Sequence, residues 1–134
     1  MSARFQVVSV PRRRDDGPVD GERAGSAPTS RRRFTWRFLA ANNRALAMAD
    51  AWYPDAASCI ASIHELKRGL KSADCEFLRD AKGLWTWRVR ADSTVASSTH
   101  RYPRQLRARM TCESFFALAD DPAAVANVSV VYRS

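Results

Sequence analysis

The sequence lacks the patterns that mark secreted, membrane-spanning and zinc-binding proteins. Its three cysteines, Cys59, Cys75 and Cys112, are odd in number and include no C-x-x-C pair, which argues against a disulfide framework and a zinc site. No apolar stretch approaches the roughly 20 residues that cross a bilayer. The apolar run at residues 5–10 is shorter than the roughly 7–15 residues of a signal-peptide core, and arginines follow it. We therefore expect a cytoplasmic protein with reduced thiols.

The common catalytic motifs are also absent. The chain contains no H-E-x-x-H, G-x-S-x-G, P-loop or G-x-G-x-x-G pattern. Its two histidines, His64 and His100, fall in unrelated contexts, and a surface or interfacial position explains each of them. Asp74, Glu76 and Asp80 lie close in sequence, which ordinary surface charge accounts for. We predict no catalytic residue, no metal and no cofactor, with an unrecognised enzymatic activity as the alternative.

The N-terminal quarter differs in composition from the rest of the chain. Residues 11–33 are dominated by Pro, Gly and charged residues without an apolar period, so they cannot bury enough surface to offset the entropy of ordering. Residues 5–10 can form a short strand but have no evident partner. We predict a disordered basic tail over residues 1–33 and one folded domain over residues 34–134.

Two arginine triplets, Arg12–Arg14 and Arg31–Arg33, bracket an acidic middle in this predicted tail. One interpretation is an arm that contacts nucleic acid or an acidic surface. The alternative is a solubilising linker, or a start codon assigned too far upstream. The sequence does not decide between these interpretations.

Two stretches of the folded part repeat one another. Phe34–Phe38 (FTWRF) matches Trp85–Val89 (WTWRV) 51 residues later, and Tyr53-Pro54 matches Tyr102-Pro103 49 residues later. Self-similarity of this kind indicates tandem units. We predict copy one over about residues 34–80 and copy two over about residues 83–132.

Each copy is predicted to form a hairpin followed by a helix, with one further strand. In copy one the strands are residues 34–40 and 44–49, and the helix over residues 56–68 is capped by Asp55 and stopped by Gly69. In copy two the strands are residues 84–90 and 94–99, and the helix covers residues 103–118. Further strands are expected at residues 75–79 and 127–132. The predicted fold is α+β, an antiparallel sheet with helices on one face.

Matching apolar positions define the expected core. The helices place Cys59, Ile63 and Leu66, and at an offset of 49 Ala108, Cys112 and Phe115, at three- and four-residue steps. Trp36, Trp85 and Trp87 alternate with polar residues, which favours a buried strand face over a base-stacking surface.

The first copy resembles a known family. Trp36–Asn42 (WRFLAAN), then Tyr53, then Cys59 with Ile63–Arg68 (IHELKR) are similar to the DUF1508 family, also called the YegP-like or UPF0339 family. The resemblance covers residues 34–69 and, more loosely, residues 84–118. It implies two tandem units in a compact α/β module, and it implies no catalytic residue because the family has no established activity. The chain departs from the family pattern at Asn43, where Gly is usual, which leaves the expected fold intact.

The chain is strongly basic. Its net charge is +8, divided equally between residues 1–33 and 34–134, and 19 of its 22 basic residues are arginine. Positive charge steers a protein toward nucleic acid, anionic membranes and acidic proteins, and arginine makes bidentate contacts with phosphate. A genome-wide codon bias toward arginine is the alternative explanation.

The densest arginine cluster suggests a binding surface. Arg88 and Arg90 share a strand face, Arg104 and Arg107 are one helical turn apart, and together they can form a phosphate-sized patch if these surfaces adjoin. Trp52, whose repeat partner is Arg101, is the candidate exposed aromatic contact. We predict a module that binds nucleic acid or another acidic partner through these five residues. The alternative is a self-associating module that pairs through exposed sheet edges such as residues 129–132.

Overall fold

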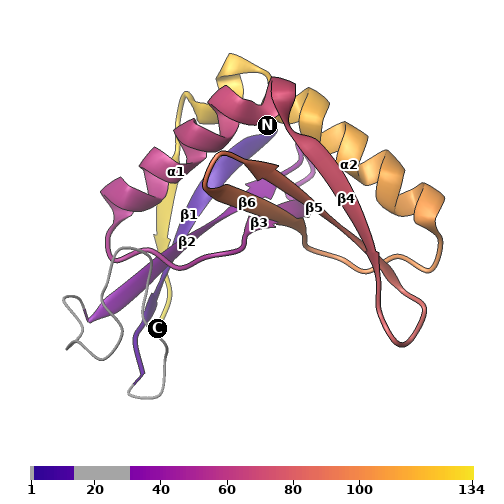
Figure 1. Cartoon of the computed structure of the whole chain (residues 1–134). Helices are drawn as coiled ribbons and strands as arrows, with labels where there is room; N and C mark the ends of the chain where they lie inside the picture. The colour runs from indigo at the N-terminus through magenta and orange to yellow at the C-terminus, as the bar shows by residue number, and fades with distance from the viewer. Residues whose placement is uncertain (1, 14–30) are drawn as a thin grey trace.

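The computed structural model describes residues 2–13 and 31–134. It contains a seven-stranded sheet with two α-helices on one of its faces, so the predicted α+β class is confirmed (Figure 1). The strands are β1 (Arg4–Pro11), β2 (Arg32–Leu39), β3 (Ala45–Ala49), β4 (Asp74–Arg79), β5 (Trp85–Ala91), β6 (Thr94–Ser98) and β7 (Ser129–Tyr132). The helices are α1 (Ala56–Gly69) and α2 (Gln105–Ala119), and the short 3-10 turns are η1 (Leu70–Ser72) and η2 (Pro122–Val125). Within the described ranges, no helix is both long and apolar enough to span a membrane.

The sheet divides naturally into two halves. Its strand order is β4-β5-β6-β3-β2-β1-β7, and every neighbouring pair is antiparallel except β1 and β7. We call β1–β3 with α1 the first half and β4–β6 with α2 the second half; they join where β3 pairs with β6. Figure 1 shows the two helices meeting at an angle above the sheet, whose two ends turn away from them to give an arched outline.

The two helices begin in different ways. Asp55 caps α1, where its carboxylate accepts a 2.7 Å hydrogen bond from the Ser58 N–H. This bond holds the pKa of the Asp55 carboxyl below its usual value. Arg104 occupies the corresponding position before α2, with no side-chain hydrogen bond and no acidic residue in the first turn. The start of α2 therefore lacks the stabilisation that a polar cap and negative charge give.

Large aromatic side chains fill the space between the helices and the sheet. Trp36, Trp87, Phe5 and Phe115 are fully buried, and the Trp87 ring stacks on Phe115 with 5.3 Å between ring centroids. The predicted burial of Trp36 and Trp87 is thus confirmed. The predicted inward helix positions are also confirmed, since all six are at most 2% exposed: Cys59, Ile63, Leu66, Ala108, Cys112 and Phe115.

Equivalent hydrogen bonds recur in the two halves. The Trp36 Nε1–H donates to Ser62 Oγ on α1 at 3.2 Å, and the Trp87 Nε1–H donates to Thr111 Oγ1 on α2 at 3.1 Å. Each half also has an isolated β-bridge to a tyrosine. Phe34 pairs with Tyr53 in the first half, and Trp85 pairs with Tyr102 in the second. The residues that match in sequence therefore make matching contacts.

The expectation that residues 1–33 lie outside the fold is wrong for β1. This strand is antiparallel to β2 and parallel to β7, and its Phe5 and Val7 are fully buried. Its partners are contributed by distant parts of the chain, so no local pattern reveals the pairing. Arg12 N–H donates to the carbonyl of Arg31 at 2.9 Å, so the intervening residues connect two paired strands. Residues 14–30 lie outside the described residues, and their disorder stays a prediction.

The predicted copy boundaries also need correction. The strand expected at residues 75–79 exists as β4, but it pairs with β5 and not with any strand of the first half. Each half therefore has three antiparallel strands followed by a helix, instead of a hairpin, a helix and a closing strand. The strand expected at the end of the chain is present as β7, at one edge of the sheet.

The three cysteines differ in their surroundings. Cys75 of β4 and Cys112 of α2 lie next to each other with Cα atoms 7.4 Å apart, beyond the usual range of disulfides, whereas Cys59 is buried and free. The sequence does not reveal this proximity, because the packing of α2 against β4 brings together side chains that are 37 residues apart.

Candidate nucleic-acid interface

The face of the sheet that the helices leave uncovered carries most of the strand arginines. We call it the open face. In β2, Phe34, Trp36 and Phe38 are buried toward the helices. Because strand side chains alternate, Arg33 and Arg37 must point to the open face. The same alternation places Arg4 and Gln6 of β1 on this face, since Phe5 and Val7 are buried on the other.

Three arginines converge on the open face of the first half. Arg4 from β1, Arg37 from β2 and Arg133, which follows β7, form what we call the first-half arginine cluster. Arg37 Nε donates to Gln6 Oε1 at 2.8 Å, and an Arg4 nitrogen donates to Asn43 Oδ1 at 2.8 Å. The pKa of Arg37 is lowered, first by burial and then by the charges of Arg133 and Arg4. The fold thus brings like charges together.

No carboxylate in residues 2–13 and 31–134 forms an ion pair with this cluster. Neutral amides are the hydrogen-bond partners of these side chains, Gln6 for Arg37 and Asn43 for Arg4. An ion pair between described residues, Arg101 with Asp80 at 3.5 Å, lies in the second half. The cluster therefore keeps its positive charge uncompensated by the described residues.

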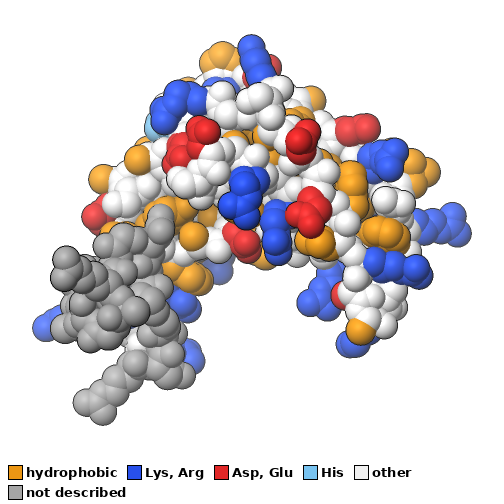
Figure 2. All heavy atoms as spheres, viewed as in Figure 1, with side chains coloured by type: hydrophobic (Ala, Val, Ile, Leu, Met, Phe, Trp, Pro, Cys, Tyr) orange, Lys and Arg blue, Asp and Glu red, His pale blue; other side chains and the backbone are white. Residues whose placement is uncertain are grey.

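The arginines of the second half have acidic neighbours. Arg88 and Arg90 point to the open face of β5, as predicted, because Trp87 and Val89 are buried on the other side. In the register of β4 and β5, Glu76 lies opposite Arg88 and Asp74 lies opposite Arg90. These carboxylates place negative charge at the facing positions, although the structure shows no ion pair between the two strands at these residues. Figure 2 shows that basic side chains are spread over both arms of the arch.

The structure does not bring the four predicted arginines together. Arg104 and Arg107 are exposed at the start of α2, and α2 packs on the face of the sheet that holds Trp87. Arg88 and Arg90 point to the opposite face. The sheet therefore separates the two predicted pairs, and no single patch contains both.

Trp52 lies beside an arginine of the open face. It is half-buried, and the guanidinium carbon of Arg33 sits 3.7 Å from the centroid of its ring. This is a close cation–π contact, of the kind that holds a guanidinium in place over an aromatic face. One face of the Trp52 ring is thus already covered by protein.

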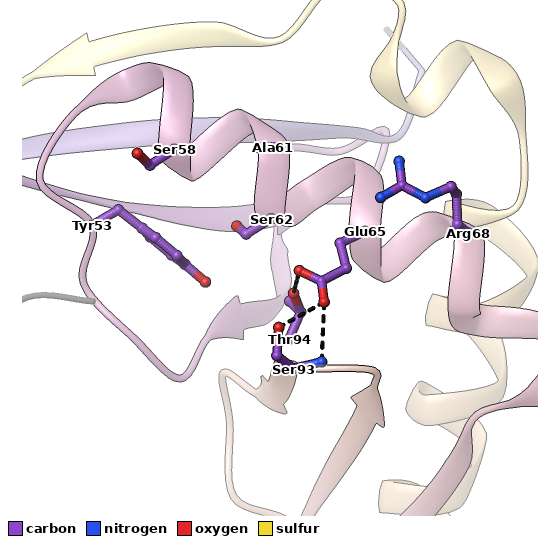
Figure 3. A pocket seen from close by; sticks show the side chains of 8 residues that line it. All are labelled: Tyr53, Ser58, Ala61, Ser62, Glu65, Arg68, Ser93 and Thr94. Atoms are coloured by element: carbon purple, nitrogen blue, oxygen red, sulfur yellow. Dashed lines mark hydrogen bonds between the residues drawn. The ribbon is translucent and has the colours of Figure 1, made fainter. Parts of the chain in front are cut away.

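A separate pocket of about 390 Å³ lies between α1 and the turn that joins β5 to β6 (Figure 3). Glu65 of α1 accepts hydrogen bonds there from the Ser93 N–H at 3.0 Å, the Ser93 hydroxyl at 2.6 Å and the Thr94 hydroxyl at 3.0 Å. These bonds, those from Ser93 foremost, lower the pKa of Glu65. The carboxylate is therefore a weak base with three of its roughly four acceptor positions occupied, and it ties the first half to the second.

The other reactive side chains near this region are also poorly suited to catalysis. Burial, with a smaller effect of the Asp55 charge, raises the pKa of Cys59 to about 12, so the nucleophilic thiolate is scarce at neutral pH. Ser62 donates to the Cys59 carbonyl and accepts from Trp36. Within the described residues, no group of three or more His, Cys, Asp or Glu side chains could hold a metal ion.

Lys67 makes a second tie between the halves. Its Nζ donates to the backbone carbonyls of Ala119, Asp120 and Asp121 at 2.9, 2.8 and 3.2 Å. The carbonyls of Ala119 and Asp120 lie at the end of α2, where the helix leaves carbonyl groups without partners, whereas the Asp121 carbonyl also accepts from the Ala124 N–H at 2.9 Å. Lys67 is thus a structural cap for α2.

The first-half arginine cluster was missed at the sequence level for a simple reason. Arg4, Arg37 and Arg133 are far apart in the chain, whereas the predicted patch relied on arginines within 22 residues of one another. The alternation of buried and polar residues in the strand at residues 5–10 was the available signal, because it would have placed Arg4 beside Arg37 once the two strands were paired.

Comparisons with known proteins bear on the fold. No protein-family model and no curated protein matches the sequence. The UPF0339 protein SO3888 from Shewanella oneidensis superposes with a TM-score of 0.61 over 98% of this chain and 92% of its own, at 8% identity. The chain has the fold of the YegP-like proteins. The protein yegP from E. coli, described as of unknown function, superposes with a TM-score of 0.55 over 99% and 94%, at 14% identity.

The fold expected from the family resemblance is therefore confirmed. At identities of 8% and 14%, these matches establish a shared architecture only. A shared fold does not determine function. What the protein does has to be inferred from its own side chains.

Proposed function

We propose that the protein is a non-catalytic binding module that holds the phosphate backbone of a nucleic acid on the first-half arginine cluster. The observation that carries this proposal is the convergence of Arg4, Arg37 and Arg133 on the open face without a described carboxylate partner. Gathering like charges costs free energy in the free protein. A bound polyanion removes that cost and receives bidentate hydrogen bonds from guanidinium groups.

The layout of the arginines favours an extended anion over a single phosphate. Tyr132 pairs with Ser9, so Arg133 lies at the level of Val10, six residues along β1 from Arg4. At a rise of about 3.4 Å per residue, Arg4 and Arg133 mark a span of about 20 Å, with Arg37 between them beside Gln6. A nucleic-acid backbone presents phosphates along such a line.

Two side chains that could act in catalysis are chemically unsuited to it, which supports a non-catalytic function. The pocket beside α1 has its one carboxylate, Glu65, engaged by three donors. The buried thiol of Cys59 has a raised pKa. Neither offers the poised base or nucleophile that catalysis requires.

The test is a binding measurement on a matched pair of double variants. Fluorescence anisotropy with a labelled oligonucleotide compares Arg37→Gln with Arg133→Gln against Arg104→Gln with Arg107→Gln, which removes the same charge from α2. We expect the first pair to weaken binding at least ten-fold and the second less than three-fold. Equal losses for both pairs would mean that net charge, and not the cluster, drives binding.

We also propose that the two halves are copies of one unit. The matching Trp-to-hydroxyl hydrogen bonds and the matching Phe34–Tyr53 and Trp85–Tyr102 bridges support this. In this view Arg37 and Arg88 are equivalent positions, because each follows the buried Trp of its half.

Self-association is the second candidate function. β7 pairs only with β1 at the edge of the sheet, and its Tyr132 is 65% exposed. β4, at the other edge, carries exposed Asp74 and Glu76, which oppose edge-to-edge pairing. Light scattering across a hundred-fold concentration range separates the two cases, since edge pairing through β7 predicts a mass that doubles with concentration.

A further inference from the structure

We infer that the preferred ligand is a single-stranded nucleic acid, whose unpaired bases lie on the middle of the open face while its phosphates lie on the first-half arginine cluster. This inference rests on the proposed function and narrows it to one class of nucleic acid. It depends on a row of side chains that crosses the sheet where the two halves join.

The pairing register places six side chains in one row, each opposite the next on the neighbouring strand. In order from β1 to β4 they are Gln6, Arg37, Met48, Ser97, Arg88 and Glu76. The residues that flank the four central members in sequence are buried toward the helices, so the row points to the open face. Neighbouring strands are about 4.8 Å apart, which puts the Arg37 and Arg88 backbones about 14 Å apart with two residues between them.

Met48 is an exposed apolar side chain in the middle of this row. It is 42% exposed, although it lies on β3, one of the two central strands. Both ends of the sheet turn away from the helices, so the open face is the inner side of the arch and Met48 lies at its centre (Figure 1). A thioether makes favourable contacts with aromatic rings, and the face of a nucleobase is such a ring.

Arg88 lies at the far end of the central part of the row and has no partner among the described residues. Its guanidinium makes no hydrogen bond or ion pair there, and its Nε is buried. Arg37 differs, because its Nε donates to Gln6 at 2.8 Å. An arginine without a protein partner can offer its plane to a base for stacking and its N–H groups to the base edge.

The position of these side chains beside the cluster favours an unpaired strand over a duplex. Met48 is one strand away from Arg37, so a base attached to a phosphate held at Arg37 lies over the row. The faces of unpaired bases are open to side chains, whereas in a duplex they are covered by the neighbouring base pairs. A single strand therefore gains contacts with Met48 and Arg88 that a duplex does not make.

The exposed aromatic rings lie at the margins of this surface. Tyr132 is 65% exposed, but it lies opposite Ser9, which is buried on the helix side, and its ring packs edge-on against Phe34. Trp52, half-buried beside Arg33, borders the open face and supplies a ring at its rim. The middle of the open face therefore relies on the row itself for apolar contact with a base.

The experiment uses the full chain with a labelled 16-nucleotide DNA strand, alone and annealed to its complement. Anisotropy titrations are run from 50 to 300 mM KCl. We expect the single strand to bind at least five-fold more tightly than the duplex. Phosphate contacts from the three arginines of the cluster predict a log–log salt slope of about −2.1 on the single strand.

Variants of the row separate contacts with bases from contacts with phosphates. Met48→Gln should weaken single-strand binding at least three-fold without changing the salt slope, because it removes no charge, and should leave duplex binding within two-fold. Met110→Gln is the matched control, since Met110 is 47% exposed on α2, and should change neither affinity. Arg88→Gln should weaken single-strand binding at least five-fold. Circular dichroism confirms that each variant is folded.

The outcomes distinguish this inference from the proposed function. Tighter binding to the duplex, or no loss of single-strand binding with Met48→Gln, overturns the inference. The proposed function still stands in that case if the double variant of Arg37 and Arg133 weakens binding. Binding to neither form at 50 mM KCl overturns the proposed function itself.

Discussion

Each half carries a Trp-Arg pair on its middle strand, and the charges around the two arginines differ. Arg37 in the first half faces Gln6 on the neighbouring strand and lies near Arg4 and Arg133. Arg88 in the second half faces Glu76 on the neighbouring strand. The first arginine therefore has a neutral residue at the facing position, and the second has an acidic one. A motif read from the sequence cannot separate these roles, because the neighbour that decides lies on another strand.

The largest expected effect is on stability, at the buried tryptophan that each half contains. Trp36→Ala and Trp87→Ala should each lower the free energy of unfolding by about 3–5 kcal/mol, because each removes a fully buried ring and leaves a cavity. Urea unfolding monitored by circular dichroism measures both. A loss below about 1 kcal/mol for either variant would show that its half does not depend on that ring.

Exchanging the charged neighbours tests the difference between the halves. Gln6→Glu places an acidic residue opposite Arg37, as Glu76 lies opposite Arg88, so we expect oligonucleotide binding to weaken about ten-fold, equivalent to about 1.4 kcal/mol. Glu76→Gln makes the reverse change and should strengthen binding by about two- to three-fold, because it removes a negative charge from the open face. Affinities that respond to neither exchange would contradict the assignment of the site to the first half.

The helix starts offer a second contrast of smaller size. Arg104→Asp gives α2 the cap that Asp55 gives α1, and should raise the free energy of unfolding by about 1 kcal/mol. Asp55→Ala should lower it by a similar amount. Chemical denaturation of the two variants beside the wild type is sufficient. A lower free energy of unfolding for Arg104→Asp would contradict this prediction, because it would mean that the Arg104 side chain itself stabilises the folded state.

The smallest expected effect is a pH dependence of stability. It comes from the Glu65 hydrogen bonds that link the two halves. Hydrogen bonds from Ser93 lower the folded-state pKa of Glu65, so its contribution is complete above the unfolded-state value of about 4.3 and is lost as pH falls through the folded-state value. Glu65→Gln should therefore be less stable than the wild type at pH 6, with the gap narrowing toward pH 3. A gap that is constant with pH would mean that the carboxylate charge plays no part in the tie.

Local patterns predicted the helices and their buried faces well. The spacing of Cys59, Ile63 and Leu66 identifies the inward face of α1 without knowledge of what covers it, and all three are fully buried. Asn43, which stands where the family usually has Gly, has a φ of 67°, in the region that Asn tolerates. These features depend on residues a few positions apart, which a sequence displays directly.

Features that depend on long-range pairing could not be predicted in the same way. The strand β1 was set aside because its partners, β2 and β7, are separated from it by intervening chain. The proximity of Cys75 and Cys112 depends on the packing of α2 on β4. The first-half arginine cluster depends on the β2-β1-β7 order, so it became visible only once the sheet was known.

The most direct test observes the arginine side chains by NMR while an oligonucleotide is added. In a ¹⁵N-labelled sample, the Nε–H resonances of Arg4, Arg37 and Arg133 should shift on titration with the oligonucleotide, together with backbone amides of β1, β2 and β7. The resonances of Arg104 and Arg107 should stay in place. Shifts confined to α2 or to Arg88 and Arg90 would contradict the assignment of the binding surface to the first half.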